Sequence, residues 1–214
     1  MKVLISGTSK GIGRAIAIEF LKHNHQVIGI DRLPPSIDHP SYIHYQLDIF
    51  LDELPTIDDV EILINNAGTQ NDNDIDNNLK GTIKFTEQYA FQEHIKSVLF
   101  IASSSASSGS EFPMYAASKG GVVAYMKNVA LRIAKYNATS NSISPGGVIT
   151  SLNEHIINDE HLYQLVKNET LLDKWASEEE IAIWAYFVTA INQSMTAQDI
   201  LIDNGEMAKS NFIW

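Results

Sequence analysis

The chain has 214 residues, a formal net charge of −11, 44% hydrophobic and 19% charged residues, and no cysteine. This length suits one domain with a core of its own, and the lack of cysteine excludes disulfides, thiolate zinc sites and iron–sulfur clusters. We expect a cytoplasmic protein without a transmembrane helix, because the apolar run at the N-terminus is too short for a signal peptide and no longer run follows.

The acidic residues are concentrated in one stretch. Nine of them, and no Lys or Arg, lie between Asp48 and Asp76, so this stretch contributes −9 of the −11. We interpret it as a solvated acidic face and expect no bound metal, because no ligand spacing supports one. Such a surface repels phosphates, so neither nucleic acid nor a membrane surface is expected as a partner.

Short apolar runs alternate along the chain with segments of helical period. Strands are predicted at residues 3–6, 27–30, 42–45, 62–64, 98–102, 139–143 and 199–202, and helices at 13–23, 75–93, 113–136 and 177–191. Most of the strand runs are apolar without interruption, which is typical of parallel strands covered on both faces. The sequence therefore predicts an α/β fold: a Rossmann-like, doubly wound parallel sheet of about seven strands, in a single domain over residues 1–214.

A glycine-rich turn joins the first strand to the first helix. Its glycines are Gly7, Gly11 and Gly13. They allow the backbone to approach a pyrophosphate, and the helix N-terminus offers unpaired N–H groups. Asp31, at the end of the second strand, can accept hydrogen bonds from a ribose diol and would repel a 2′-phosphate, whereas Lys10 and Arg32 would attract one. We give the carboxylate more weight and expect NAD(H), with NADP(H) as the alternative.

The spacing of these glycines resembles that of the short-chain dehydrogenase/reductase family, and later motifs extend the resemblance along the whole chain. It implies that Asp48 binds the adenine amino group, with Ile49 beside it. The motif at residues 65–68 implies a turn that stabilises the sheet and lines the cofactor site. The segment at 144–150 implies contact with the nicotinamide carboxamide through its backbone and Thr150.

Tyr115 and Lys119 lie four residues apart near the start of the third predicted helix, so their side chains share a face. A phenol with a pKa near 10 is a poor acid or base at neutral pH. A nearby ammonium lowers that pKa toward the working range. The family resemblance implies Tyr115 as the general acid and base, with Lys119 as its electrostatic partner and ribose ligand.

Two further residues complete the expected catalytic set. The family has a serine after the fifth strand that hydrogen-bonds the substrate carbonyl, and the local pattern favours Ser104 over Ser103. The separation from Tyr115 is shorter than is usual in the family, which keeps Ser103 as the alternative. Asn78 resembles the family's helix asparagine, which kinks its helix and helps to hold a relay water; Asn77 is the alternative.

The resemblance implies an oxidoreductase that transfers a hydride between nicotinamide and a carbonyl or secondary alcohol of a small, partly apolar substrate. A substrate lid is expected at about residues 151–175, and a homodimer or homotetramer through the last strand and its neighbouring helix. The alternatives are reduction of 3-oxoacyl thioesters and a non-catalytic NAD(P)-sensing protein. The expected catalytic residues are Asn78, Ser104, Tyr115 and Lys119. The expected cofactor-binding residues are Gly7, Ser9, Lys10, Gly11, Ile12, Gly13, Asp31, Arg32, Asp48, Ile49, Asn66, Ala67, Gly68, Tyr115, Lys119, Pro145, Gly146, Val148 and Thr150.

Overall fold

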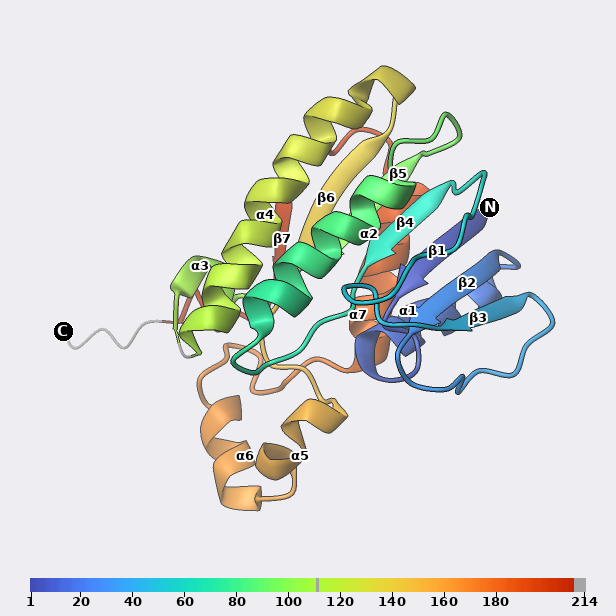
Figure 1. Cartoon of the computed structure of the whole chain (residues 1–214). Coiled ribbons are helices and arrows are strands. Elements are labelled where there is room, and N and C mark those ends of the chain that lie inside the picture. Colours follow the sequence, from blue (N-terminus) through green and yellow to red (C-terminus); the bar gives the residue numbers. More distant parts are fainter. Residues whose placement is uncertain (111, 210–214) are drawn as a thin grey trace.

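A computed structural model describes residues 1–110 and 112–209, and in it the seven predicted strands form one parallel sheet (Figure 1). The strands are β1 (Lys2–Ser6), β2 (Gln26–Asp31), β3 (Tyr42–Gln46), β4 (Ile62–Asn65), β5 (Ser97–Ile101), β6 (Thr139–Pro145) and β7 (Asp199–Ile202). Their order across the sheet is β3-β2-β1-β4-β5-β6-β7. The order reverses direction between β1 and β4, and in doubly wound sheets this switch point opens a crevice at the carboxyl ends of the strands.

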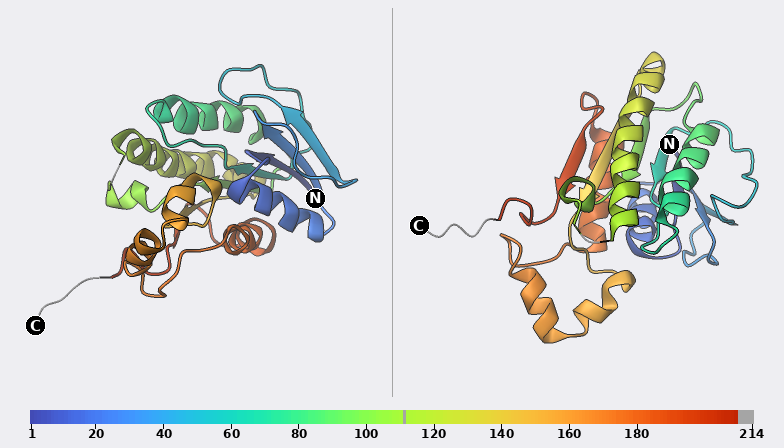
Figure 2. Two further views of the ribbon diagram at one scale, coloured as in Figure 1. Left: turned by 90° about the horizontal axis from the view of Figure 1, so that it is seen from below. Right: turned by 60° about the vertical axis from the view of Figure 1, so that its left-hand side comes forward.

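Helices cover both faces of the sheet, which explains the uninterrupted apolar strands. α1 (Gly11–Lys22) and α7 (Glu178–Tyr186) lie on one face, and α2 (Gly81–Tyr89) and α4 (Pro113–Ile133) lie on the other (Figure 2). In β1, Val3 and Ile5 pack into the core under α1 and α7, while Leu4 packs into the core of the opposite face. All three side chains are fully buried.

The helix expected at residues 75–93 is divided into two parts. A π-helical segment, η1 (Ile75–Lys80), precedes α2, which ends at Tyr89. The last helix likewise changes from α7 into a π-helical segment, η4 (Phe187–Ile191), and it begins with a capping box between Ser177 and Glu180. Wider π-turns interrupt the 3.6-residue period, so a periodicity argument merges them with the neighbouring α-helix. The remaining helices are η2 (Ala134–Tyr136), η3 (Ser151–Asn153), α3 (Ser105–Ser108), α5 (Glu154–Ile157) and α6 (Glu160–Lys167).

The crossover from β3 to β4, residues 47–61, is fully described and contains no helix. Its buried side chains Ile49, Ile57 and Val60 cover the sheet face where a helix would otherwise pack. Side chains of α2 and of the residues just after it donate hydrogen bonds to backbone carbonyl oxygens of the crossover. Tyr89 Oη donates to Pro55 O at 2.6 Å, and Gln92 Nε2 donates to Ile57 O at 2.9 Å.

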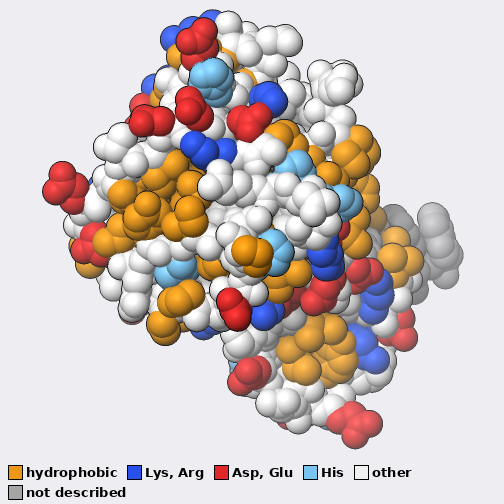
Figure 3. Space-filling view, turned by 90° about the vertical axis from the view of Figure 1, so that its right-hand side faces the viewer, with side chains coloured by type: hydrophobic (Ala, Val, Ile, Leu, Met, Phe, Trp, Pro, Cys, Tyr) orange, Lys and Arg blue, Asp and Glu red, His pale blue; other side chains and the backbone are white. Residues whose placement is uncertain are grey.

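The outer edge of the sheet shows the consequence of this missing helix. Ile43 and Tyr45 of β3 are 43% and 37% exposed, and Leu51 of the crossover is 76% exposed. Hydrophobic side chains are accordingly visible in patches on the face of the molecule that carries this edge (Figure 3).

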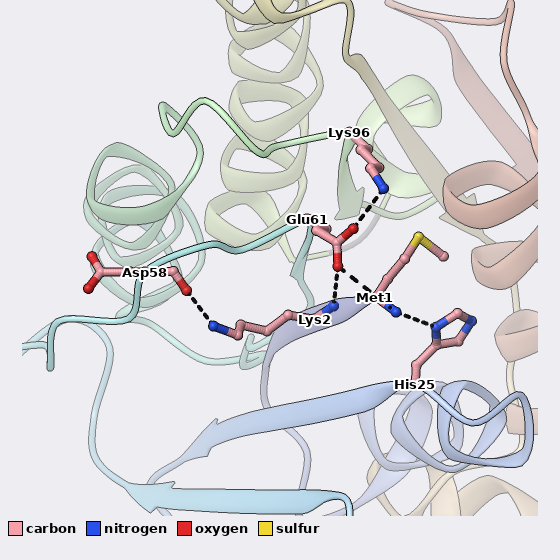
Figure 4. A network of polar contacts seen from close by, with 6 residues as sticks. All are labelled: Met1, Lys2, His25, Asp58, Glu61 and Lys96. Atoms are coloured by element: carbon pink, nitrogen blue, oxygen red, sulfur yellow. Dashed lines mark hydrogen bonds and ion pairs between the residues drawn. The ribbon is translucent and has the colours of Figure 1, made fainter.

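A polar network joins the amino ends of β1, β4 and β5 (Figure 4). The Glu61 carboxylate accepts hydrogen bonds from the backbone N–H of Lys2 and from Lys96 Nζ, each at 2.7 Å. Burial alone would raise the pKa of Glu61, and these two donors outweigh it, so that the pKa is lowered. The network lies at the edge of the sheet opposite the carboxyl ends of the strands.

One member of the acidic stretch contradicts its interpretation as a solvated face. Asp74 is 1% exposed, whereas Asp52, Asp58 and Asp59 are exposed as expected. Separately, none of the helices in the described part of the chain has the length and apolar character that spanning a bilayer requires.

Candidate active site

A cavity of about 700 Å³ opens at the carboxyl ends of the strands, at the switch point between β1 and β4. It extends from the glycine turn after β1 to the start of α4 and the segment after β6. Every expected cofactor-binding residue lines it except Ser9 and Gly13, which lie behind the turn. The structure thus brings together in one cavity expected cofactor-binding residues that are as much as 143 positions apart, namely Gly7 and Thr150.

The glycine turn packs directly against the turn after β4. Gly7 has φ +78°, and a Cβ on Gly13 would lie 2.0 Å from the carbonyl oxygen of Gly7. Asn66 Nδ2 donates to the carbonyl oxygens of Ser6 and Gly7 at 3.1 and 3.0 Å. Residues with side chains therefore do not fit at Gly7 and Gly13. The backbone of the turn stays accessible from the cavity, as binding of a dinucleotide pyrophosphate requires.

Asp31 lies at the end of β2, where the second strand meets the cavity. Its Oδ2 accepts from the backbone N–H of Ser9 at 2.9 Å, and its Oδ1 accepts from the N–H of Leu33 at 2.8 Å. Each oxygen retains a second lone pair for a ligand hydroxyl. Lys10 and Arg32 are exposed at the cavity rim, so solvent screens their charges more than that of the half-buried carboxylate.

Tyr115 and Lys119 occupy the first turns of α4 and face the cavity together. Lys119 Nζ lies 5.6 Å from the centroid of the Tyr115 ring and donates to Ile101 O at 2.8 Å. Burial lowers the pKa of Lys119 to about 8, with the Asp74 carboxylate acting in the opposite direction.

The pKa of Tyr115 differs from the expected lowering. Burial raises it, a hydrogen bond with the Ser103 side chain lowers it, and the charge of Asp74 raises it. Desolvation of the phenolate therefore outweighs the effect of the Ser103 hydroxyl on the pKa of Tyr115.

The serine beside the phenol is Ser103. Its side chain is 8% exposed and lies close enough to Tyr115 to lower the pKa of the phenol. The expected Ser104 also lines the cavity, and its backbone N–H donates to Pro145 O at 2.8 Å. Three consecutive serines follow β5 here, so residue type does not distinguish them. The course of the backbone determines which of the three hydroxyls lies beside the Tyr115 phenol.

Asn78 lies within η1 and is 1% exposed. Its Nδ2 donates to Thr69 O at 2.8 Å, and its Oδ1 accepts from the N–H of Thr69 at 2.7 Å. This two-way bond fixes the amide against the turn that follows β4. Asn77 instead lines the cavity itself. The kink expected at Asn78 takes the form of the π-helical segment, a feature often found at functional sites.

Asp48 and Thr150 lie at opposite ends of the cavity. Asp48 Oδ1 accepts from the N–H groups of Phe50 and Leu51 at 2.8 and 3.2 Å, which orders the start of the crossover. Thr150 Oγ1 is buried without a hydrogen-bond partner among the described residues. Such an atom calls for an additional polar group, and the carboxamide expected at this position suits it.

The segment expected to form a lid folds into η3, α5 and α6, which project beyond the carboxyl edge of the sheet (Figure 1). Leu152, Ile156, Val166 and Trp175 of this segment line the cavity. The Trp175 indole packs on Gly147, where a Cβ would lie 2.2 Å from Nε1. The segment therefore supplies most of the apolar wall at this end of the cavity.

Two residues of the site escaped the sequence reasoning. Thr69 lines the cavity, and Asp74 is buried behind it. Asp74 belongs to a run in which Asp72 and Asp76 alternate with it, so composition alone does not distinguish it from its neighbours.

Comparisons with known proteins agree with this arrangement. A family model described as enoyl-(acyl carrier protein) reductase matches residues 46–206. A 3-oxoacyl-(acyl-carrier-protein) reductase of Buchnera aphidicola subsp. Acyrthosiphon pisum is 26% identical, over 95% of this chain and 95% of that protein. The glycine turn and Asp31 precede the matched family region, and the longer alignment includes most of the chain before residue 46.

Solved structures extend the similarity to the whole fold. A 4-hydroxyisoleucine dehydrogenase complexed with NADH has a TM-score of 0.82 and 26% identity, covering 98% of this chain and 99% of the other. A putative 2-deoxy-d-gluconate 3-dehydrogenase from Agrobacterium tumefaciens with bound NADP has a TM-score of 0.86 and 23% identity, covering 97% and 96%.

Proposed function

Because the chain belongs to the short-chain dehydrogenase/reductase family of NAD(P)-dependent oxidoreductases, we propose that it interconverts a carbonyl and a secondary alcohol with Tyr115 as general acid and base. The observation that carries this proposal is the Ser103–Tyr115–Lys119 group, which faces the same cavity as the glycine turn and Asp31.

Each side chain of the group has a distinct task. The Ser103 hydroxyl holds the substrate oxygen beside the phenol, in place of the expected Ser104. The Tyr115 phenol moves the hydroxyl proton, and the Lys119 ammonium favours the phenolate that must form. Asn78, whose amide is fixed from both sides by Thr69, keeps the turn beside Lys119 in place.

The residues of the cavity also support a cofactor assignment. Bound NAD(P) supplies the nicotinamide carbon that exchanges the hydride. The glycine turn would hold the pyrophosphate, Asp31 the adenosine ribose, and Thr150 the carboxamide. Asp31 supports NAD(H) over NADP(H), because a half-buried carboxylate would meet a 2′-phosphate directly.

A small, uncharged and partly apolar substrate suits the remaining part of the cavity, with residues 151–175 as its lid. The cationic Lys and Arg side chains of the cavity lining are Lys10, Arg32 and Lys119, all in the cofactor-binding or catalytic groups. The described substrate end thus offers no Lys or Arg to bind a carboxylate or phosphate. Reduction of a 3-oxoacyl thioester is the second candidate, supported by the similarity to the Buchnera reductase.

The test of the proposed function is a panel of secondary alcohols and ketones assayed with NAD(H) and NADP(H). Tyr115→Phe should reduce kcat at least about 100-fold, because it removes the proton donor. Tyr125→Phe is the matched control, since Tyr125 lies on the same helix and its hydroxyl bonds Glu87 at 2.7 Å, away from the cavity. Turnover that survives in Tyr115→Phe would refute the assignment.

The cofactor preference has its own test. Asp31→Ser removes the carboxylate and should raise NADPH affinity relative to NADH by about tenfold or more, measured by fluorescence titration of each reduced dinucleotide. Wild-type protein that binds NADPH more tightly than NADH would contradict the preference, without affecting the assignment of Tyr115.

An oligomer is proposed through the surface of α7, η4 and β7. Five large apolar side chains are exposed there: Ile183, Trp184, Phe187, Ile191 and Leu201. Adjacent exposed apolar residues of this kind mark association surfaces. Trp184→Glu should shift the mass measured by light scattering to that of a monomer. A wild-type protein that is monomeric at micromolar concentration would refute the proposal.

A further inference from the structure

A buried carboxylate, Asp74, lies in the same part of the protein as the catalytic lysine. Asp74 is 1% exposed and directly precedes the π-helical segment η1. Its Oδ1 accepts from Thr69 Oγ1 at 2.7 Å, and its Oδ2 accepts from the N–H of Asn71 at 3.0 Å. A buried charge is costly unless it is hydrogen-bonded and offset by an opposite charge, and these two neutral donors provide only the first condition.

A series of contacts through Thr69 and Asn78 connects Asp74 with the surroundings of Lys119. Thr69, which donates to Asp74, is bound on both sides of its peptide by the Asn78 amide. Next to Thr69, a Cβ on Gly68 would lie 3.2 Å from Asn78 Oδ1 and 3.5 Å from Lys119 Nζ. The amide and the ammonium therefore flank the same glycine. Asn78 Nδ2 also lies 3.3 Å from the hydroxyl of Ser118, the neighbour of Lys119 on α4.

Lys119 is likewise a buried charged residue, since it is only 5% exposed. Its one hydrogen bond within the described residues goes to the neutral carbonyl of Ile101, and no carboxylate there forms an ion pair with it. The Asp74 carboxylate is the charged group that acts on it through space. It acts on Tyr115 as well, and raises the pKa of the phenol.

We propose that Asp74 is an electrostatic positioning residue, which keeps the buried Lys119 as an ammonium ion and thereby sets the pH range in which Tyr115 can exchange its proton. This role rests on the proposed function of the site and adds a residue to it. The titratable groups on which the charge of Asp74 acts are Tyr115 and Lys119 of α4. The groups that its side chain contacts by hydrogen bonds are the uncharged Thr69 and Asn71. On its own segment, Asp76 pairs with Lys80 at 2.7 Å on the surface.

The proposal predicts a shift of the whole pH–activity profile. Alcohol oxidation needs Tyr115 deprotonated and Lys119 protonated, so both limbs of the profile depend on the pKa values of these two groups. The negative charge of Asp74 raises both pKa values. Asp74→Asn should therefore move both limbs of kcat/KM to lower pH, each by about one pH unit. A purely structural role would lower the rate and leave the limbs in place.

Three variants make the test specific. Asp76→Asn removes a carboxylate two residues away that is paired on the surface, and it should leave the profile unchanged. Asp74→Glu retains the charge and should return the limbs toward those of wild type. Asp74→Ala is a second neutral variant, because an asparagine amide could oppose the N–H of Asn71 and impair folding. Unshifted limbs in a folded neutral variant would overturn the proposal.

A second readout does not depend on turnover. Tyrosinate absorbance is titrated in wild type and Asp74→Asn, each with and without Tyr115→Phe, and the differences isolate Tyr115. Its midpoint should lie at lower pH in the Asp74→Asn background; equal midpoints would refute the role of Asp74. Absence of turnover would count against the proposed function alone, because this titration would still report on Asp74.

Discussion

Replacing the buried lysine should stabilise the protein while it abolishes turnover. Lys119→Met retains an unbranched chain of similar size and removes the ammonium. The pKa of Lys119 falls from 10.5 to about 8 on folding because burial disfavours the charged form. At about 1.4 kcal/mol for each unit of pKa, this change corresponds to roughly 3 kcal/mol lost from the stability of the ligand-free protein at neutral pH.

The net effect is smaller than this figure. The substitution also removes the hydrogen bond from Lys119 Nζ to Ile101 O, and a buried carbonyl without its donor costs about 1–2 kcal/mol. We therefore expect Lys119→Met to be more stable by about 1–2 kcal/mol at pH 7, with Tm higher by about 2–8 °C. Turnover should fall at least about 100-fold.

The higher stability of Lys119→Met could come from removal of a buried charge or from better packing, and the pH dependence of the stability difference distinguishes the two. Between pH 8 and 10.5 the unfolded chain holds the lysine proton and the folded chain does not, so wild-type stability gains a rising contribution over this window. Lys119→Met lacks that contribution, and its advantage should shrink toward pH 10. Urea denaturation of both proteins without dinucleotide measures the difference. The exposed Lys127 on the same helix provides the control Lys127→Met. A Lys119→Met protein less stable than wild type at pH 7 would refute the reasoning.

Two further substitutions address the glycine turn and the crossover. Gly13→Ala places a Cβ 2.0 Å from a backbone oxygen and should weaken NADH binding at least about tenfold in a fluorescence titration, while Gly120→Ala, with its nearest neighbouring atom at 3.7 Å, should bind normally. Tyr89→Phe removes the 2.6 Å bond to Pro55 O and should cost about 1–2 kcal/mol in urea denaturation. Tyr136→Phe, which removes a bond of 3.3 Å, should cost less; equal losses would show that the crossover is not held by Tyr89.

The sequence is most informative about the sheet. All seven strands are predicted from short apolar runs, and their parallel arrangement from the alternation of most of these runs with helical segments. Local patterns describe neither the division of the helix expected at 75–93 nor the bonds that order the crossover at 47–61, where no helix is predicted. In the first, a π-helical segment changes the period. In the second, the ordering bonds come from Tyr89 and Gln92, which lie far along the chain.

Some residues of the candidate site could be predicted from the sequence and others could not. Tyr115, Lys119 and the glycines follow from residue type and spacing, because their chemistry demands fixed separations along one helix or turn. Ser103 does not, since adjacent serines differ only in the direction of their side chains. The sequence gives even less indication of Asp74. Its burial depends on the fold around Thr69, and an aspartate in an acidic run is ordinarily exposed.

The helix-free crossover also imposes an order on folding. Its backbone carbonyls are paired by Lys84, Tyr89 and Gln92, whose positions are 32 to 35 residues further along the chain. A helix would satisfy the same groups locally, whereas these bonds can form only when Lys84, Tyr89 and Gln92 lie against the crossover. Contacts of such sequence separation form late because the loop must first close. We therefore expect the acidic crossover to become ordered after α2 rather than before it.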